Sequence, residues 1–228
     1  MIVLYDLVGA DEDRPYSPHC WKAKMCLAHK GLDYRTEPVR FLDAPNVEGG
    51  FSRTVPVIRD GDKVVADSFD IALYLEETYP QRPSLFRGKG GEAMARMIER
   101  WSQTQLHPFL GAAALKDIYD RQDPENQVYF RESREARFGD TIEAVSARRD
   151  AQLADFRSRL EPLQSVLTYQ PFIGGQTPLF PDYIVFGALQ WVRIMSSYRF
   201  IEDPAILAWF ERCLDLHDQL GRGVPAAA

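Results

Sequence analysis

The hydrophobic pattern of this chain changes near residue 85, and that change constrains the fold more than any other feature. Up to residue 80, short apolar runs with the two-residue period of strands alternate with runs that have helical spacing. Beyond residue 90 only helical spacing recurs, and Pro80 and the glycine-rich segment 88–91 lie between the two parts. We therefore expect an α/β domain over 1–80, a linker over 81–90 and an all-α domain over 91–228.

The α/β domain has the element order strand, helix, strand, and then, after a connector, strand, strand, helix. Asp60-Gly61 is the strongest kind of two-residue hairpin signal, and it joins the last two strands. The predicted strands are Ile2–Asp6, Asp33–Arg40, Val55–Arg59 and Lys63–Ala66, and the predicted helices are Ser17–Lys30 and Ser68–Tyr79.

The remainder of the chain is predicted to form a bundle of helices. The predicted helices are Glu92–Ala114, Gln127–Phe138, Thr141–Leu167, Phe180–Met195 and Pro204–Leu220. Phe180–Met195 is apolar on nearly every side, which places it in the middle of the bundle. The segment Gly223–Ala228 is expected to be a frayed tail.

Charge and hydropathy exclude two classes of partner. The formal net charge of −6 leaves no basic surface for nucleic acid. The longest apolar stretch, about ten residues between Tyr183 and Val192, is far shorter than the ~20 residues that cross a bilayer, so no membrane partner is expected. Met1 leads directly into a strand pattern without the features of a secretory signal.

The cysteines indicate a reducing compartment. Cys20, Cys26 and Cys213 are odd in number, and their spacing is not that of metal ligands. Reduced thiols fit this usage best, so we expect a cytoplasmic protein that holds no metal.

The strongest chemical signal is Ser17-Pro18 at the start of the first helix. Pro18 suits the first helical position because its φ is fixed and it has no N–H, which makes Ser17 the N-cap. One interpretation is a purely structural cap. The other is a site for a thiolate or another anion, because a helix N-terminus presents free N–H groups and the positive end of the dipole.

Two further signals each have a structural and a functional interpretation. Val55-Pro56 is typical of an edge strand, or of a cis bond that leaves the main-chain groups of Val55 free to pair with an extended peptide. Asp67-Ser68 is a helix cap, or a site where N–H groups and the Ser68 hydroxyl hold a carboxylate while Asp67 takes an ammonium.

Together, Ser17-Pro18 opening the first helix, Val55-Pro56 before a hairpin and Asp67-Ser68 opening the second helix resemble the thioredoxin-like domain of cytosolic glutathione transferases. The all-α remainder is similar to that family's second domain, so the resemblance covers essentially the whole chain. It implies an α/β thioredoxin-like domain followed by an all-α domain, and a homodimer.

Within the family, three segments are most similar to the bacterial and fungal β-etherase-like branch. They are Ser17–Lys24, Arg53–Ile58 and the run from Gly174 to Tyr183. The isomerase branch that acts on maleylacetoacetate has a Ser-Ser-Cys run, and Ser17-Pro18-His19 stands there in this chain, which argues against that activity.

The resemblance implies an enzyme that activates glutathione as a thiolate and needs no metal. Its partner substrate would be a small hydrophobic electrophile, in detoxification or in the catabolism of aromatic compounds. Ser17 would hold the thiolate. The implied glutathione contacts are Arg53 for the glycyl carboxylate, the main chain of Val55 for the cysteinyl unit, Pro56 as the cis-proline, and Asp67 and Ser68 for the γ-glutamyl group.

The electrophile pocket is expected between the domains. Tyr16 lies next to the thiolate site and walls this pocket in our prediction, while Trp101, His107 and Tyr119 fall on helices that line it in the family. Aromatic residues on helices are more often part of the core, which is the competing interpretation. In the β-etherase-like branch the thiolate displaces a phenolate from a carbon next to a ketone.

Other assignments remain open. Tyr5 and Tyr16 are rivals of Ser17, because some branches activate the thiol with tyrosine, although Tyr5 lies in a strand pattern typical of the core. Cys20 is either a buried spectator or the thiol of a glutathione-dependent reductase. A protein of the same fold could also bind glutathione or hydrophobic ligands without turnover. Leu179 stands where the family usually has a capping Ser or Thr, so Asp182 should form only part of a capping box.

Overall fold

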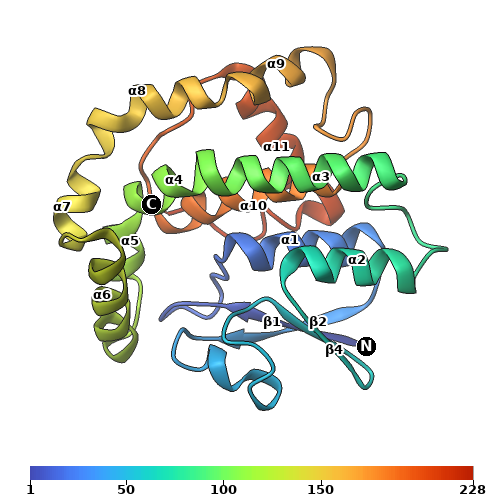
Figure 1. The fold of residues 1–228 in the computed structure, drawn as a ribbon, viewed down its shortest axis with the longest axis horizontal. Helices are drawn as coiled ribbons and strands as arrows, with labels where there is room; N and C mark the ends of the chain where they lie inside the picture. Colours follow the sequence, from blue (N-terminus) through green and yellow to red (C-terminus); the bar gives the residue numbers. More distant parts are fainter. Residues whose placement is uncertain (228) are drawn as a thin grey trace.

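The computed structural model describes residues 1–227, and a four-stranded mixed sheet is the base of its N-terminal domain (Figure 1). The strand order is β2-β1-β3-β4, with β1 parallel to β2 and antiparallel to β3, so that Leu4 lies opposite Ile58 in the core. The strands are β1 (Ile2–Leu7), β2 (Tyr34–Val39), β3 (Val57–Asp60) and β4 (Lys63–Ala66). The predicted α/β order is confirmed.

Helix α1 (Pro18–His29) lies between the sheet and the helical domain, and α2 (Ser68–Thr78) runs beside it (Figure 1). A short 3-10 segment, η1 (Ala44–Gly49), connects β2 to the loop before β3. Because α1 has partners on nearly all sides, the lysines of α1 and of its C-cap are buried, and each is paired with a carboxylate on a different element. These pairs are Lys22 with Glu99, Lys24 with Asp6, and Lys30 with Glu76.

Within the described residues, the regular elements of the second domain are helices, and an isolated β-bridge joins Phe172 to Gly175. Its helices are α3 (Lys89–Trp101), α4 (His107–Ala113), α5 (Leu115–Asp120), α6 (Pro124–Phe138), α7 (Ile142–Ala147), α8 (Arg149–Arg159), α9 (Glu161–Tyr169), α10 (Phe180–Met195) and α11 (Pro204–Gln219). Figure 1 shows α10 crossing the centre of this domain, between α3 in front and α11 behind. The prediction for α10 is confirmed at both ends.

Two predicted helices are interrupted. The expected helix Glu92–Ala114 contains a π-helical turn, η2 (Ser102–Leu106). Pro108, two residues beyond it, has no N–H to donate to the preceding turn, and within η2 the Thr104 hydroxyl donates to Arg100 O at 2.9 Å. The expected helix Thr141–Leu167 is three helices, α7, α8 and α9. Helix α5 was not predicted.

Hydrogen bonds to Asp182 hold the start of α10 in place. Asp182 is fully buried and accepts four N–H donors at 2.7–3.0 Å, from Ile173, Gly174, Leu179 and the Trp209 indole. Leu179 has no side-chain acceptor, so only half of a capping box forms, as predicted.

At Gly187 on α10, a Cβ would lie 2.3 Å from the carbonyl oxygen of Pro18, so only glycine allows α10 to approach the first turn of α1 this closely.

The expectation of a frayed tail is wrong for residues 223–227, and Ala228 lies outside the described residues. The Arg193 guanidinium donates to Val224 O, and the Ala227 N–H donates to Arg193 O at 2.8 Å. Arg14 donates to the carbonyl oxygens of residues 225 and 226. These arginines satisfy the terminal carbonyl groups, which composition alone does not reveal. Every helix within residues 1–227 falls short of the length and apolar character that spanning a bilayer would require.

Candidate functional site

Ser17 is the N-cap of α1, as predicted, and it is 3% exposed. Its Oγ accepts a hydrogen bond from the Cys20 N–H at 3.2 Å, and Pro18 occupies the first helical position. A hydroxyl that accepts one N–H keeps its own proton to donate. Ser17 therefore offers a donor at the positive end of a helix dipole, which suits an anion such as a thiolate.

Cys20 lies one turn into α1 and is fully buried. Its thiol is directed toward the carbonyl oxygen of Tyr5, at 3.8 Å, and burial raises the pKa of the thiol strongly. Since the thiolate is the nucleophilic form, Cys20 is inert at neutral pH in this arrangement.

The Val55–Pro56 peptide bond is cis, which confirms the predicted geometry. Strand β3 begins at Val57 and not at Val55 as expected, so Val55 lies just outside the sheet ladder. Within residues 1–227 neither the N–H nor the C=O of Val55 has a hydrogen-bond partner. Such a residue can pair with an extended peptide as an added strand.

Arg53 lies two residues before Val55 with its side chain exposed. No carboxylate among residues 1–227 forms an ion pair with it. Its guanidinium is available for an anionic group at one end of the Val55 segment.

Asp67 is the N-cap of α2 in a left-handed backbone conformation, φ 72°, which is costly for a residue with a Cβ. Its Oδ1 accepts the N–H groups of Phe69 at 2.7 Å and of Asp70 at 3.3 Å. These two N–H groups are thus taken, contrary to the expectation that they hold a carboxylate. The hydroxyl and N–H of Ser68 have no partner in the described part of the chain.

The hydroxyl groups of both rival tyrosines are engaged elsewhere. Tyr5 donates to Glu48, which also pairs with Arg59 at 2.8 Å, and burial together with Glu48 raises the pKa of Tyr5. Tyr16 is buried with its hydroxyl against Gln122 at 3.2 Å, and burial raises its pKa as well. Neither geometry presents a phenol hydroxyl to a thiol at the start of α1.

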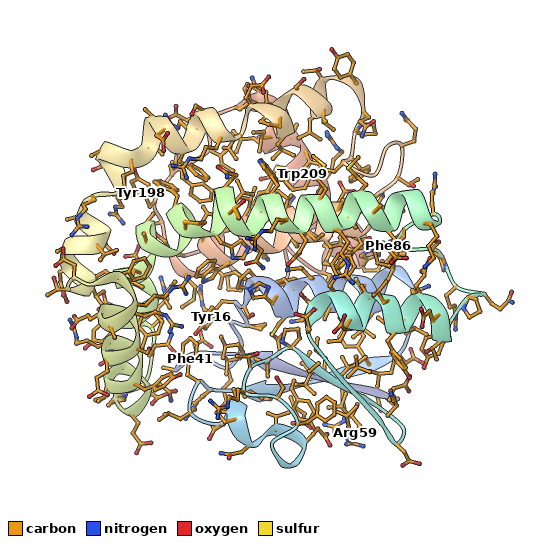
Figure 2. The ribbon with its side chains drawn as sticks, in the orientation of Figure 1. Tyr16, Phe41, Arg59, Phe86, Tyr198 and Trp209 are labelled. Carbon is orange, nitrogen blue, oxygen red and sulfur yellow. The ribbon has the colours of Figure 1, made fainter. Side chains whose placement is uncertain are left out.

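Figure 2 shows Tyr16 and Phe41 in the region between α1 and α6, where their rings meet edge to face at 6.5 Å. Phe41 also packs on Phe130 of α6, and the Leu42 N–H donates to Asn126 of the same helix. The loop after β2 therefore docks on α6 and covers Tyr16, so this residue is enclosed and does not line an open pocket.

Of the three aromatic residues predicted on the helices, contacts place His107 beside the start of α1. The His107 ring stacks on His19 with the centroids 5.3 Å apart and the planes 25° apart. Trp101 is half-buried at the end of α3. Tyr119 packs under Arg131, whose guanidinium is 4.4 Å from the ring centroid, on the side of α5 that faces α6.

Sequence reasoning did not single out the polar cluster around His19. Lys22, one turn further along α1, forms an ion pair with Glu99 at 2.8 Å, and Gln103 donates to Glu99 at 3.0 Å. Glu99, Gln103 and His107 recur every four residues, which puts them on one helix face. That spacing was the signal available in the sequence. Among residues 1–227, no three His, Cys, Asp or Glu side chains gather as metal ligands.

Two family models match the chain. The glutathione S-transferase N-terminal domain matches residues 16–78, and the C-terminal domain matches residues 93–212. Glutathione S-transferase Z1 of Arabidopsis thaliana is 42% identical over 112 residues, 47% of this chain and 51% of that protein. The glutathione S-transferase-like protein ustS of Aspergillus flavus is 28% identical over 222 residues, 82% of this chain and 76% of that protein.

Solved structures agree on the architecture. A glutathione S-transferase of Ceriporiopsis subvermispora, crystallised with glutathione, superposes with a TM-score of 0.82 at 23% identity and covers 96% of both chains. This likeness shows the fold. The chain spans about half the length of several of its curated relatives.

Proposed function

This chain belongs to the glutathione S-transferase family, and on that premise we propose that it binds glutathione at the start of α1 and activates its thiol for attack on a hydrophobic electrophile. The observation that carries the proposal is Ser17, a buried hydroxyl with its proton free at a helix N-terminus. A hydrogen bond to a charged group contributes about 1.5–3 kcal/mol and the helix dipole up to about 2 kcal/mol. Effects of this size lower a thiol pKa by about 1–2 units.

Glutathione has an extended backbone, two carboxylates and one ammonium, and the neighbouring residues match these groups. The unpaired main chain of Val55 supports pairing with the cysteinyl unit. Exposed Arg53 suits the glycyl carboxylate. At the other end, Ser68 offers an N–H and a hydroxyl to the γ-glutamyl carboxylate, and the Asp67 carboxylate is exposed to meet the ammonium.

The second substrate would lie beside the sulfur, where the first turn of α1 faces α4. His107 is the pocket residue best supported by contacts, and Trp101 and Tyr119 remain parts of the proposed pocket, whereas Tyr16 is enclosed and is no longer assigned to it. The resemblance in sequence to the β-etherase-like branch supports an aryl ether next to a ketone as the electrophile. There the thiolate forms a C–S bond, the C–O bond breaks, and the electron pair leaves on the phenolate.

We further propose that the protein is a homodimer in the cytoplasm. Met94 and Met97 lie three residues apart on α3 and are 50% and 64% exposed, and Phe51 is 54% exposed; this exposed apolar surface supports the proposed interface. The three cysteines are free and buried, and such thiols are stable in a reducing compartment.

The alternative is a protein of the same fold that binds glutathione without turnover. The slight exposure of Ser17, 3%, favours this alternative because it limits the access of a ligand sulfur. A third possibility, reduction through Cys20, requires a reactive thiol, and the burial of Cys20 argues against it.

Calorimetric titration with glutathione tests the site. We expect wild type to bind, and Arg53→Ala and Ser68→Ala to bind about 5- to 50-fold more weakly, since each loses a hydrogen bond to a charged group of the ligand. Arg35→Ala on exposed β2 is the matched control and should bind as wild type does. The absence of binding in wild type at millimolar glutathione would refute the proposal.

Assays of glutathione conjugation distinguish a transferase from a reductase and from a binding protein. The transferase predicts that Ser17→Ala loses activity and that Cys20→Ser keeps most of it. A reductase predicts the reverse order, and glutathione binding without conjugation of any electrophile would indicate the binding protein.

A further inference from the structure

The stacked rings of His19 and His107 join the first turn of α1 to the first residue of α4. His19 is two residues beyond Ser17, and His107 directly follows the π-helical turn η2. Turns of this kind occur frequently at functional sites because they turn a side chain out of the regular helical register. Here the turn comes just before His107, whose ring stacks on His19, two residues beyond Ser17.

The His107 ring is held on two sides. His19 stacks on one side, and the Trp191 ring lies 6.0 Å from it on α10. Trp191 itself packs against Gly111, where a Cβ would lie 3.1 Å from the indole. A ring fixed in this way keeps its nitrogen atoms in constant directions, as a group that meets a substrate must.

The Nε2 atom of His107 is buried and has no hydrogen-bond partner among residues 1–227. Leaving a buried polar atom unpaired costs about 1–3 kcal/mol, and such atoms are rare in folded proteins. If the His107 ring only filled space, an apolar ring could take its place without leaving a buried polar atom unpaired. The unpaired nitrogen therefore calls for a partner that arrives from outside the chain.

The protonation state of His107 follows from its surroundings. Burial, helped by the charges of Lys22 and Arg137 and opposed by Glu99, lowers the pKa of His107 to about 4. Burial also lowers the pKa of His19. Both rings are neutral at pH 7, and a neutral imidazole has one N–H donor and one acceptor.

We propose that His107 is a catalytic residue that donates a hydrogen bond from Nε2–H to an oxygen of the electrophile on which negative charge develops. The inference rests on the proposed function. In attack on an aryl ether the sulfur–carbon bond forms, the carbon–oxygen bond breaks, and the electron pair passes to the phenolate oxygen. The imidazole keeps its proton throughout, and the hydrogen bond strengthens as the oxygen gains charge.

This proposal names a substrate class. His107 would speed the reaction of electrophiles that release an oxygen anion, such as α-aryloxy ketones. Benzyl halides release a halide, so His107 would change their reaction rate little. A single donor to a developing oxyanion contributes about 100- to 1,000-fold in rate in well-studied enzymes. A phenolate is a good leaving group and carries only part of its charge in the transition state, so the His107 hydrogen bond should raise the rate by about 10- to 100-fold.

The test is steady-state kinetics at saturating glutathione with ring-substituted 2-aryloxyacetophenones and with benzyl chloride. His107→Phe keeps a ring for stacking and removes the donor, His107→Gln restores a donor, and Gln105→Ala is a control for disturbance of η2. We expect kcat for the ketones to fall about 10- to 100-fold in His107→Phe, with a partial recovery in His107→Gln. For benzyl chloride kcat should stay within about threefold. Equal losses for both electrophiles, or no loss, would overturn the inference.

The dependence of kcat on the pKa of the phenol gives a second readout that a structural role would not move. A hydrogen bond to the leaving oxygen makes the rate less sensitive to phenol pKa. Wild type should therefore show a shallower slope than glutathione thiolate in water, and His107→Phe a steeper slope than wild type. If wild type matches the reaction in water, His107 has no such role, whether or not the variant folds.

Glutathione calorimetry on the same samples separates the two proposals. Wild type that binds and conjugates glutathione but shows no selectivity for oxygen leaving groups refutes only the role of His107. Wild type that conjugates neither electrophile refutes the transferase, and the role of His107 with it.

Discussion

The Oγ atom of Ser17 accepts a hydrogen bond from the main-chain N–H of Cys20 at 3.2 Å. This one contact orients the hydroxyl, caps α1 and leaves the hydroxyl proton free. It also explains how a residue can be a structural cap and a thiolate donor together, since the cap uses an acceptor lone pair and the thiolate would use the donor. The two interpretations of Ser17-Pro18 in the sequence are therefore compatible.

Asp182 should dominate the stability of the helical domain. Replacement by Ala leaves the N–H groups of Ile173, Gly174, Leu179 and Trp209 without an acceptor. The last two are buried, and each of these costs about 1–3 kcal/mol. We expect a loss of at least about 3 kcal/mol in the free energy of unfolding, measured by urea denaturation.

The exposed carboxylate Asp155 pairs with Arg159 on the surface of α8 and is the control, with an expected loss below about 0.5 kcal/mol. A loss under about 1 kcal/mol for Asp182→Ala would show that this network contributes little.

His217 should make stability depend on pH. Its Nε2 lies 3.1 Å from the Tyr183 hydroxyl, which also contacts His29 at 2.6 Å, and burial lowers the pKa of His217 to about 4. The unfolded chain binds a proton at His217 near pH 6.5 and the folded chain does not. The contribution of the neutral His217 ring to the free energy of unfolding is therefore complete above pH 6.5. It is lost as the pH falls toward 4.

Urea denaturation of wild type and His217→Gln at pH 7 and pH 5 measures this effect. The stability advantage of wild type over the variant should shrink by up to about 2 kcal/mol at pH 5, less any solvent screening. An advantage that is equal at both pH values would contradict the assignment.

Lys22 and Glu99 form an ion pair across the domain interface, with the lysine side chain fully buried and the glutamate 19% exposed. Glu99→Gln leaves the buried ammonium without its charge partner, so we expect a loss of about 2–4 kcal/mol in unfolding free energy. Lys22→Met in the same background should recover part of that loss. A double-mutant cycle checks this, and additive effects would show that the pair is not coupled.

Much of the N-terminal site could be predicted because its signals are local. The Ser17 cap and the Asp67 cap each follow from two adjacent residues, whereas the cis bond at Pro56 was implied by the family resemblance, and the structure has all three. The start of β3 was missed by two residues because the cis bond turns Val55 out of the ladder.

The helical domain shows where sequence reasoning ends. Helix α10 was predicted at both ends because it is apolar all round. Pro162 marks the break between α8 and α9 at Leu160 in the sequence. The break between α7 and α8 at Arg148 has neither glycine nor proline to mark it. The stacking of His107 on His19 joins residues far apart in the chain and depends on how the domains pack, so no local pattern could predict it.

The most direct test of the account is the pKa of the bound glutathione thiol, measured by thiolate absorbance against pH. Wild type is compared with Ser17→Ala and with Ser17→Gly. Glycine at an N-cap costs only a few tenths of a kcal/mol against about 1 for alanine, so the glycine variant removes the hydroxyl with α1 nearly intact.

We predict a thiol pKa about 1–2 units below that of free glutathione in wild type, and a return toward the free value in both variants. A thiol pKa as low in Ser17→Gly as in wild type, or one that is not depressed in wild type, would contradict the claim that Ser17 activates the thiol.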